Sequence, residues 1–310
     1  MNISIIGAGI IGLSTAIKLL EAGFDVTILS KSTTPNTTSD IAAAYWAASD
    51  LLADEQKRTL GFAARARLLE LAQTPESGIR QLPLLVLSQA DHKPDLWETL
   101  PDVRELPSGQ FAPPWNHGFS FTTFQFDVPT YMPFLYQHLE KLGGKFVSRE
   151  VKKFEELDAD VMINCTGLGA KALVADDDLY PIRGQIMRLS RPDDFPEQII
   201  TAEDASQVSY IVPRIKDVIL GGTYQHHRDD EAVDQKTADA IWERCLTLEP
   251  ALSQAKLLEH RVGIRPGRPL PRLERDPHQA NLIHNYGHGS LGHTLAWGCA
   301  ERVLEIVKSL

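Results

Sequence analysis

The 310-residue sequence has little cysteine, no run of basic residues and no uninterrupted long apolar segment. Its three cysteines (Cys165, Cys245 and Cys299) are far apart, which favours a reducing compartment over a disulfide framework. The formal charge of −10 argues against nucleic acid or an anionic membrane as the main partner, because both attract basic surfaces. The apolar N-terminus is broken by glycine and serine and lacks a basic flank, so we expect neither a signal peptide nor a membrane span. The C-terminal VKSL is not the peroxisomal Ser-Lys-Leu signal, and we expect a cytoplasmic protein.

The composition is that of an ordinary globular protein, with 43% hydrophobic and 23% charged residues. Its length allows two domains. The first 30 residues read as strand, glycine turn, helix and strand. We expect helices in 41–74, 128–144, 234–252 and 294–310, strands in 145–148, 158–167 (running into a glycine turn), 184–191, 209–214, 217–225, 257–266 and 281–287, and an irregular segment in 75–130. The alternating strands in the middle of the chain predict a mostly antiparallel sheet.

This order of elements predicts an α/β protein made of two interleaved domains. A Rossmann-like nucleotide-binding domain is expected from residues 1–74, 128–180 and 266–310. A second domain, built on the antiparallel sheet, is expected from residues 75–127 and 181–265. The chain therefore should cross between the two domains several times.

A glycine-rich turn in the first strand–helix unit carries a nucleotide signal. Gly7-Ala8-Gly9-Ile10-Ile11-Gly12 follows a strand and opens a helix, which is the context in which the G-x-G-x-x-G pattern has meaning. Gly7 allows the tight turn, Gly9 lets the backbone approach a pyrophosphate, and Gly12 lets the helix pack on the sheet. The free N–H groups at the helix start favour phosphate.

The end of the second strand leaves the identity of the dinucleotide open. An acidic residue is usual there, and this chain has Ser30-Lys31-Ser32 instead. A serine can still bond a ribose hydroxyl, whereas a lysine could accept a 2′-phosphate. This half of the motif therefore separates FAD from NADP poorly, and Lys31 could equally be a solvated surface residue.

The stretch HNYGHGSLGHT, residues 284–294, is ambiguous by itself. It could be a metal site, a catalytic histidine cluster or a glycine turn that lets the backbone approach a ligand. Histidines at 284, 288 and 293 could ligate zinc, but the glycines would scatter them and no cysteine or acid joins them in the loop. We therefore expect no metal, with His288 packed in the interior.

Seven motifs, in order, resemble those of the D-amino-acid oxidase family of flavoenzymes. They are IIGAGIIGLSTA (5–16), TTSDIAAAYW (37–46), VMINCTGLGA (161–170), RGQIM (183–187), SYIVPRIKDVILGGTYQ (209–225), GIRPGRPLPRLERD (263–276) and HNYGHGSLGHTLAWGCA (284–300). The resemblance spans nearly the whole chain and implies FAD as the cofactor. It also implies that the 284–294 stretch is a glycine loop beside the flavin, with Gly287, Gly289 and Gly292 at positions of close approach.

The resemblance implies a set of cofactor-binding residues along the chain. These are Gly7, Ala8, Gly9, Ile11, Gly12, Ser30, Lys31, Thr37, Thr38, Ser39, Ala44, Tyr45, Val151, Cys165, Thr166, Gly167, Gly289, Ser290, Gly292, His293 and Thr294. The helix from Thr294 onward is expected to aim its N–H groups at the pyrimidine edge of the flavin. Cys165 is expected to be a small packed residue, since nothing basic lies near it in sequence.

The same resemblance implies an amino-acid site at the flavin. Arg265 would bind the substrate carboxylate bidentately, and Tyr210 would bond it through its hydroxyl, with Arg268 structural. The backbone carbonyl of Ser290 would receive the substrate amine. The implied reaction transfers a hydride from Cα to flavin N5; dioxygen then gives hydrogen peroxide, and the imino acid hydrolyses to a 2-oxo acid and ammonia.

Departures from the family pattern bear on specificity. Tyr224 replaces the arginine of relatives that act on acidic D-amino acids, so we expect neutral or aromatic substrates. Tyr45 and Ala47 replace residues common in animal members, and the segment 201–208 lacks a lid aromatic, which predicts an open mouth. Alternatives are a glycine or secondary-amine oxidase, an amino-acid dehydrogenase, a binding protein without turnover and an NADP-dependent reductase. A homodimer is expected only by analogy with the family.

Overall fold

The computed structural model describes residues 1–47, 51, 54–89, 99–107, 109–111, 114–203 and 208–310. The main helices are α1 (Ile10–Glu21), α2 (Glu55–Ala72), α3 (Val128–Lys141), α4 (Ala170–Val174), α5 (Gln235–Leu248) and α6 (Gly292–Lys308). The strands are β1 (Asn2–Ile6), β2 (Asp25–Ser30), β3 (Ile79–Ser88), β4 (Arg104–Leu106), β5 (His117–Phe126), β6 (Lys145–Ser148), β7 (Val161–Asn164), β8 (Tyr180–Ser190), β9 (Ile199–Glu203), β10 (Val208–Pro213), β11 (Asp217–Gly221), β12 (Gln225–His226), β13 (Leu257–Gly267), β14 (Arg272–Arg275) and β15 (Leu282–Tyr286).

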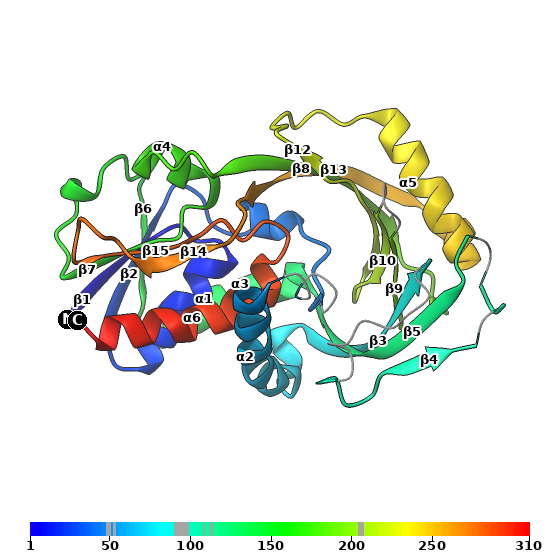
Figure 1. Ribbon diagram of the computed structural model, residues 1–310, viewed down its shortest axis with the longest axis horizontal. Coiled ribbons are helices and arrows are strands. Elements are labelled where there is room, and N and C mark those ends of the chain that lie inside the picture. The colour runs from blue at the N-terminus through cyan, green and yellow to red at the C-terminus, as the bar shows by residue number, and fades with distance from the viewer. Residues whose placement is uncertain (48–50, 52–53, 90–98, 108, 112–113, 204–207) are drawn as a thin grey trace.

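Two sheets organise the chain. The smaller sheet has the order β14-β15-β7-β1-β2-β6, and all its neighbours are parallel except β14 and β15. The larger sheet has the order β12-β8-β11-β10-β9-β3-β5-β4, with β13 also paired to β8, and only β3 and β9 run parallel in it. Figure 1 shows the smaller sheet with α1, α3 and α6 at one end of the molecule and the curved larger sheet at the other. The expected α/β fold with an antiparallel second sheet is confirmed.

The core of the smaller sheet follows from its sequence pattern. All residues of β1 and β7 except Asn2 are buried, and most of them are apolar on both faces, as parallel strands covered by helices require. The helices α1 and α6 bury their apolar faces side by side, and α6 also packs tightly on α2. A Cβ atom at Gly298 would lie 2.0 Å from the carbonyl oxygen of Leu60, so only glycine allows this approach of the two helices.

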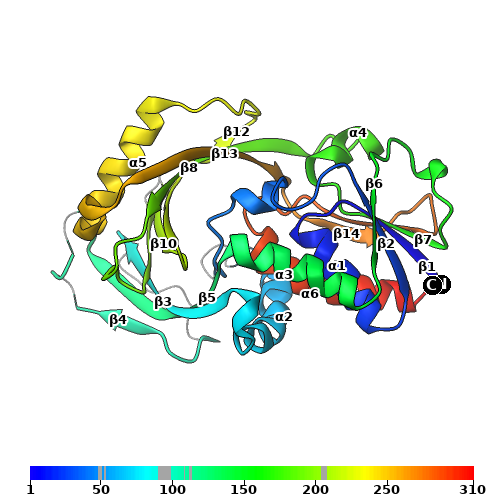
Figure 2. The same ribbon diagram turned by 180° about the vertical axis from the view of Figure 1, so that it is seen from behind.

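The expectation of an irregular segment in 75–130 is wrong. It contains β3 and β5, which pair over ten residues each, and the short strand β4. Pro83 is tolerated in β3 because the pairing of β3 with β9 begins only at Leu84, so no partner on that side requires an N–H from residue 83. Figure 2 shows β3 and β5 along the outer curve of the larger sheet.

The expected helix over 41–74 is correct only in its second part. Residues before α2 run beside β5 instead: Trp46 donates its N–H to the Phe124 carbonyl, and Tyr45 forms a bridge with Gln125. The short helical turn Thr38–Ile41 ends at Ala42, which is extended, and Ala44 then has a φ of 54°, in the left-handed region. The chain thereby enters the region between the two sheets.

Candidate active site

A cavity of about 1870 Å³ lies between the carboxyl end of the smaller sheet and the inner surface of the larger one. Nearly all the sequence-predicted site residues line it. From the cofactor list these are Gly7, Ala8, Gly9, Ile11, Ser30, Lys31, Thr37, Thr38, Ser39, Ala44, Tyr45, Val151, Cys165, Thr166, Gly167, Gly289, Ser290, Gly292 and His293, and from the substrate list Arg265, Tyr210 and Tyr224. Gly12 and Thr294 do not line it and lie behind its wall.

The turn between β1 and α1 is built by glycine. Gly7 has a φ of 111°, and a Cβ atom there would lie 2.4 Å from the Cys165 carbonyl oxygen. A Cβ atom at Gly12 would meet the Gly7 carbonyl oxygen at 1.9 Å, so Gly12 allows the turn to fold against α1. The helix begins at Ile10 with no side-chain cap on Gly9, and both residues line the cavity. The start of α1 therefore offers N–H groups and the positive end of its dipole to a ligand.

The segment 33–41 forms the next wall and depends on Asp40, which sequence reasoning missed. The buried Asp40 carboxylate accepts hydrogen bonds from the Thr37 hydroxyl at 2.6 Å, the Thr37 N–H at 2.9 Å and the Thr34 hydroxyl at 2.6 Å. Ser39 in the same turn accepts the Ile10 N–H at 2.9 Å. The T-x-x-D spacing of a capping box was the available signal.

At the end of β2, the Lys31 ammonium lies 3.6 Å from the Glu150 carboxylate, and both side chains are exposed. The neighbouring Ser30 hydroxyl donates to the Ser32 carbonyl at 2.8 Å. A carboxylate beside Lys31 repels a phosphate group, so this end of the cavity is poorly suited to a 2′-phosphate.

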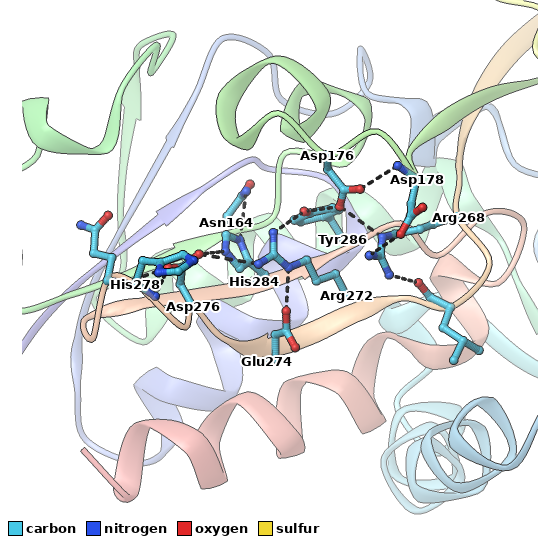
Figure 3. A network of polar contacts seen from close by, with 12 residues as sticks. Asn164, Asp176, Asp178, Arg268, Arg272, Glu274, Asp276, His278, His284 and Tyr286 are labelled. Carbon is cyan, nitrogen blue, oxygen red and sulfur yellow. Dashed lines mark hydrogen bonds and ion pairs between the residues drawn. The ribbon is translucent and has the colours of Figure 1, made fainter.

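The turn after β7 is held by a polar network (Figure 3). Asn164 Oδ1 accepts the Thr166 hydroxyl at 2.7 Å and the Thr166 N–H at 3.2 Å. The Asn164 Nδ2 lies 3.4 Å from His284 Nδ1. His284 Nε2 lies 2.9 Å from the Asp276 carboxylate. Burial lowers the pKa of His284, against the opposing effect of Asp276. The imidazole therefore stays neutral near pH 7 and links Asp276 to the cavity wall.

A second part of this network surrounds Tyr286 (Figure 3). The Tyr286 hydroxyl donates to the Asp176 carboxylate at 2.6 Å, and Arg272 donates to the same hydroxyl at 3.1 Å. Burial, together with the bond to Asp176, raises the pKa of Tyr286 to about 12. Arg268 pairs with Asp176 at 3.1 Å and with Asp178 at 3.2 Å. Arg268 is not among the residues that line the cavity, and its partners are those of a structural residue.

The three histidines of the 284–294 stretch have different partners. His284 binds Asp276, His288 Nε2 lies 3.4 Å from Cys299 Sγ, and His293 Nε2 donates to the Ser39 carbonyl at 3.1 Å. Burial lowers the pKa of His288 to about 3, as expected for a packed residue. Among the described residues, no group of three or more His, Cys, Asp or Glu side chains is placed to hold a metal ion.

Two glycines of this stretch adopt left-handed backbone conformations. Gly287 and Gly289 have φ values of 83° and 56°, and the Gly289 N–H donates to the Pro266 carbonyl at 2.8 Å. The loop therefore binds the end of β13 and leads directly into α6, which begins at Gly292 and not at Thr294. The Thr294 hydroxyl accepts the Ala47 N–H at 3.3 Å and donates to the Tyr45 carbonyl at 3.4 Å, so it supports two residues of the cavity wall.

Cys165 is buried, and burial raises the pKa of its thiol. Its side chain therefore stays protonated and packs behind the turn, as expected. Ser290 is exposed at the opposite wall of the cavity, and Tyr45 and Ala47 approach the same space from the segment beside β5.

The larger sheet brings Arg265 and Tyr210 together. Arg265 Nη1 donates to the Thr223 carbonyl at 3.0 Å, and its guanidinium carbon lies 4.6 Å from the centre of the Tyr224 ring. Burial raises the pKa of Tyr210, and the adjacent Arg265 guanidinium opposes that rise. Tyr224 is 41% exposed and forms the outer side of this group.

Glycines that sequence reasoning missed make room for both side chains. A Cβ atom at Gly184 would lie 2.2 Å from Arg265 Nη1, and Cβ atoms at Gly221 and Gly222 would lie within 2.6 Å of the Tyr210 ring. RGQ and GGT were the signals, since a glycine inside a strand marks close approach of another group. The result is the Arg265 guanidinium beside the buried Tyr210 phenol in the wall of the cavity.

A model of the FAD-dependent oxidoreductase family matches residues 2–306 of the chain. The chain belongs to the FAD-dependent oxidoreductase family. Its similar relatives include a D-amino-acid oxidase of Rubrobacter xylanophilus, 38% identical over 96% of this chain and 93% of the relative. A D-aspartate oxidase of Homo sapiens is 32% identical over 99% and 94%. A glycine oxidase of Geobacillus kaustophilus is similar in structure, with a TM-score of 0.86 and 20% identity over 99% and 94% of the chains.

Membership of the FAD-dependent oxidoreductase family resolves the choice that the end of β2 left open. The protein is an oxidoreductase whose cofactor is FAD. The resemblance seen in the sequence motifs is confirmed over nearly the whole chain. In the part of the chain that the structure describes, no helix has both the length and the apolar character needed to cross a bilayer.

Proposed function

We propose that the protein catalyses the oxidative deamination of neutral or aromatic D-amino acids, with FAD as hydride acceptor and dioxygen as final acceptor. The observation that carries the proposal is the position of Arg265, a cation held beside Tyr210 in the wall of the cavity. Support for the handedness comes from relatives named D-amino-acid oxidase, which are 38% and 32% identical over more than nine-tenths of this chain.

The cavity suits FAD by its chemistry. The start of α1 presents the N–H groups of Gly9 and Ile11 to the pyrophosphate. The Gly7 N–H donates to the Leu29 carbonyl at 2.8 Å and the Ile10 N–H to Ser39 at 2.9 Å, and both bonds hold the turn in place. Ser30, Val151 and the turn at Thr166 would contact the adenosine half. The start of α6, with Gly292 and His293, also opens on the cavity without a side-chain cap. A second helix N-terminus is suited to an isoalloxazine edge that gains negative charge on reduction.

When bound, FAD supplies the acceptor for the α-hydrogen of the amino acid and passes the electrons to dioxygen, which gives hydrogen peroxide. Arg265 binds the substrate carboxylate: a guanidinium has five N–H groups, and the bond to Thr223 uses one of them. The Tyr210 hydroxyl, which burial keeps protonated, donates a second bond to the same carboxylate. The Ser290 carbonyl accepts the substrate amine. These contacts orient Cα, and orientation is the main contribution of the protein to the rate.

Tyr224 determines the side-chain preference. The Arg265 guanidinium lies over its ring, and the ring adds no charge of its own to the site. A substrate with a second carboxylate would have to desolvate that group without a partner, which is costly. Neutral and aromatic side chains avoid this cost. The lid segment considered above includes residues 204–207, which lie outside the described residues.

The proposal is tested by measuring hydrogen peroxide formation with D-alanine, D-phenylalanine, L-alanine, glycine and sarcosine. The D-amino acids should be the preferred substrates by kcat/KM. Preference for glycine or sarcosine would assign the chain to the glycine and secondary-amine oxidases instead. Flavin reduction by D-alanine without peroxide would indicate a dehydrogenase that uses another electron acceptor.

A further inference from the structure

The helix α5 contacts the back of the strands that hold Tyr210. Its half-buried residue Arg244 donates from Nε to the Ser209 hydroxyl at 3.0 Å and from Nη2 to the Gly222 carbonyl at 3.5 Å. Ser209 directly precedes Tyr210 in β10 and is 5% exposed. The guanidinium therefore joins the residue before Tyr210 to the loop that packs against its ring.

The neighbouring residue Cys245 reinforces the same connection. It is fully buried, and its Sγ lies 3.7 Å from the Tyr210 carbonyl oxygen and 3.8 Å from the Gly221 carbonyl oxygen. Tyr210 and Gly221 are paired across β10 and β11. Two adjacent residues of α5 thus contact both strands at the position of the active-site phenol.

The slot that holds the Tyr210 ring is narrow. Cβ atoms at Gly221 and Gly222 would lie 2.0 Å and 2.6 Å from ring atoms, so the backbone of these glycines forms the slot itself. A small shift of Gly222 relative to β10 would therefore move or release the ring. The next residue, Thr223, accepts the hydrogen bond from Arg265, so the same shift would also disturb the guanidinium.

From this geometry we infer that Arg244 is a positioning residue for the carboxylate site. It fixes the distance between Ser209 and Gly222, and thereby holds Tyr210 and Arg265 in the arrangement that receives the amino acid. Arg244 also borders the cavity, and the inference is that it acts through its bonds to Ser209 and Gly222 and not by binding the amino acid. The inference rests on the proposed function, because it concerns the same carboxylate site.

The test uses FAD-saturated protein with Arg244→Ala, Arg244→Lys and Ser209→Ala. The alanine variant at 244 should raise the KM for D-alanine and the Kd for benzoate, read from the flavin absorbance, by about tenfold, with a smaller change in kcat. Lysine retains one donor for Ser209 and should recover part of the loss. Ser209→Ala should reproduce the direction of the change, and the double variant should lose less than the sum of the two.

Arg228→Ala is the matched control, because Arg228 is exposed and pairs with Asp230, so its substitution removes the same charge and leaves the contacts with Ser209 and Gly222 in place. It should leave both constants as in the unmodified protein. The inference is overturned if the Arg244 and Ser209 variants keep normal KM and benzoate affinity. It is also overturned if only acidic substrates are affected, because Arg244 would then contact the substrate. If the unmodified protein itself fails to oxidise D-amino acids yet binds benzoate, the proposed function fails, and the benzoate comparison still tests Arg244.

Discussion

Arg265 lies over the ring of Tyr224, with 4.6 Å between the guanidinium carbon and the ring centre. The two residues come from β13 and from the loop after β11, which meet only in the folded protein. Tyr224 therefore both packs on the group that binds the carboxylate and occupies a place where another cation could be introduced. This pair makes the substrate preference testable by a single substitution.

Tyr224→Arg should raise kcat/KM for D-aspartate relative to D-alanine by about tenfold, because the new guanidinium would pair with the second carboxylate. Peroxide formation with the two substrates gives the ratio directly. Tyr224→Phe retains the ring without a charge and should leave the ratio unchanged. An unchanged ratio in the arginine variant would refute the assignment of Tyr224 to the substrate pocket.

Gly184→Ala should weaken substrate binding without unfolding the protein. The added Cβ would lie 2.2 Å from Nη1 of Arg265, and the guanidinium, as the far end of a flexible side chain, would move aside. Misplacement of this kind should raise the KM for D-alanine on the order of 10- to 100-fold.

The matched control is Gly263→Ala, at the position that pairs with Gly184 across β8 and β13. Its Cβ would approach Ile41 at 3.1 Å and leave Arg265 untouched. Equal effects of the two substitutions on KM would show that the strand pair, and not Arg265, is responsible.

Removal of FAD should lower thermal stability, because a ligand that binds only the folded state stabilises it by mass action. At a free FAD concentration 100 times its Kd, the gain is about 2.7 kcal/mol, a shift of several degrees in Tm. Thermal unfolding of the apoprotein at increasing FAD concentrations measures this shift in Tm. NADP⁺ at the same concentrations should give no shift, because Glu150 lies beside Lys31 and would repel the 2′-phosphate. A comparable shift with NADP⁺ would show that the cavity near Lys31 accepts a 2′-phosphate.

The Asp276 carboxylate should make the protein sensitive to acid. Burial by itself would raise its pKa, but hydrogen bonds from His284 and from the N–H groups of His278 and Gln279 outweigh this and hold the pKa at about 2. A depressed pKa gives stability that is complete above the unfolded value of about 4 and is lost as the pH falls from about 4 to about 2. The contribution is roughly 1 to 2 kcal/mol.

Asp276→Asn should therefore flatten the dependence of the unfolding free energy on pH between about 5 and 2, when measured by urea denaturation. Asp193→Asn, at an exposed acid, serves as the control and should retain the slope of the unmodified protein. A slope that stays the same in Asp276→Asn would place the acid-sensitive group elsewhere.

Hydrophobic periodicity and turn residues predicted those elements that depend on neighbouring residues in the sequence. The glycine turn at Gly7, the helix α3 and the buried strand β7 follow from turn chemistry and periodicity within a few residues. These features depend on neighbours in the sequence.

The rest depended on contacts between distant residues. β3 and β5 were not predicted, because prolines and aromatics mask an alternation that only their mutual pairing makes visible. Gly184 and Arg244 have no local sign of their roles, which arise where β8 meets β13 and where α5 meets β10. The roles of these residues arise from tertiary packing and not from the sequence around them.

The most direct test is anaerobic reduction of the FAD-loaded protein, followed by the loss of flavin absorbance, with D-alanine, L-alanine and the Arg265→Ala variant. We expect D-alanine to bleach the flavin and L-alanine to leave it yellow. The variant should need at least about 30 times more D-alanine for the same rate, because the substrate carboxylate would lose its charged partner. Normal reduction of Arg265→Ala by D-alanine, or equal reduction by the two enantiomers, would contradict the proposed site.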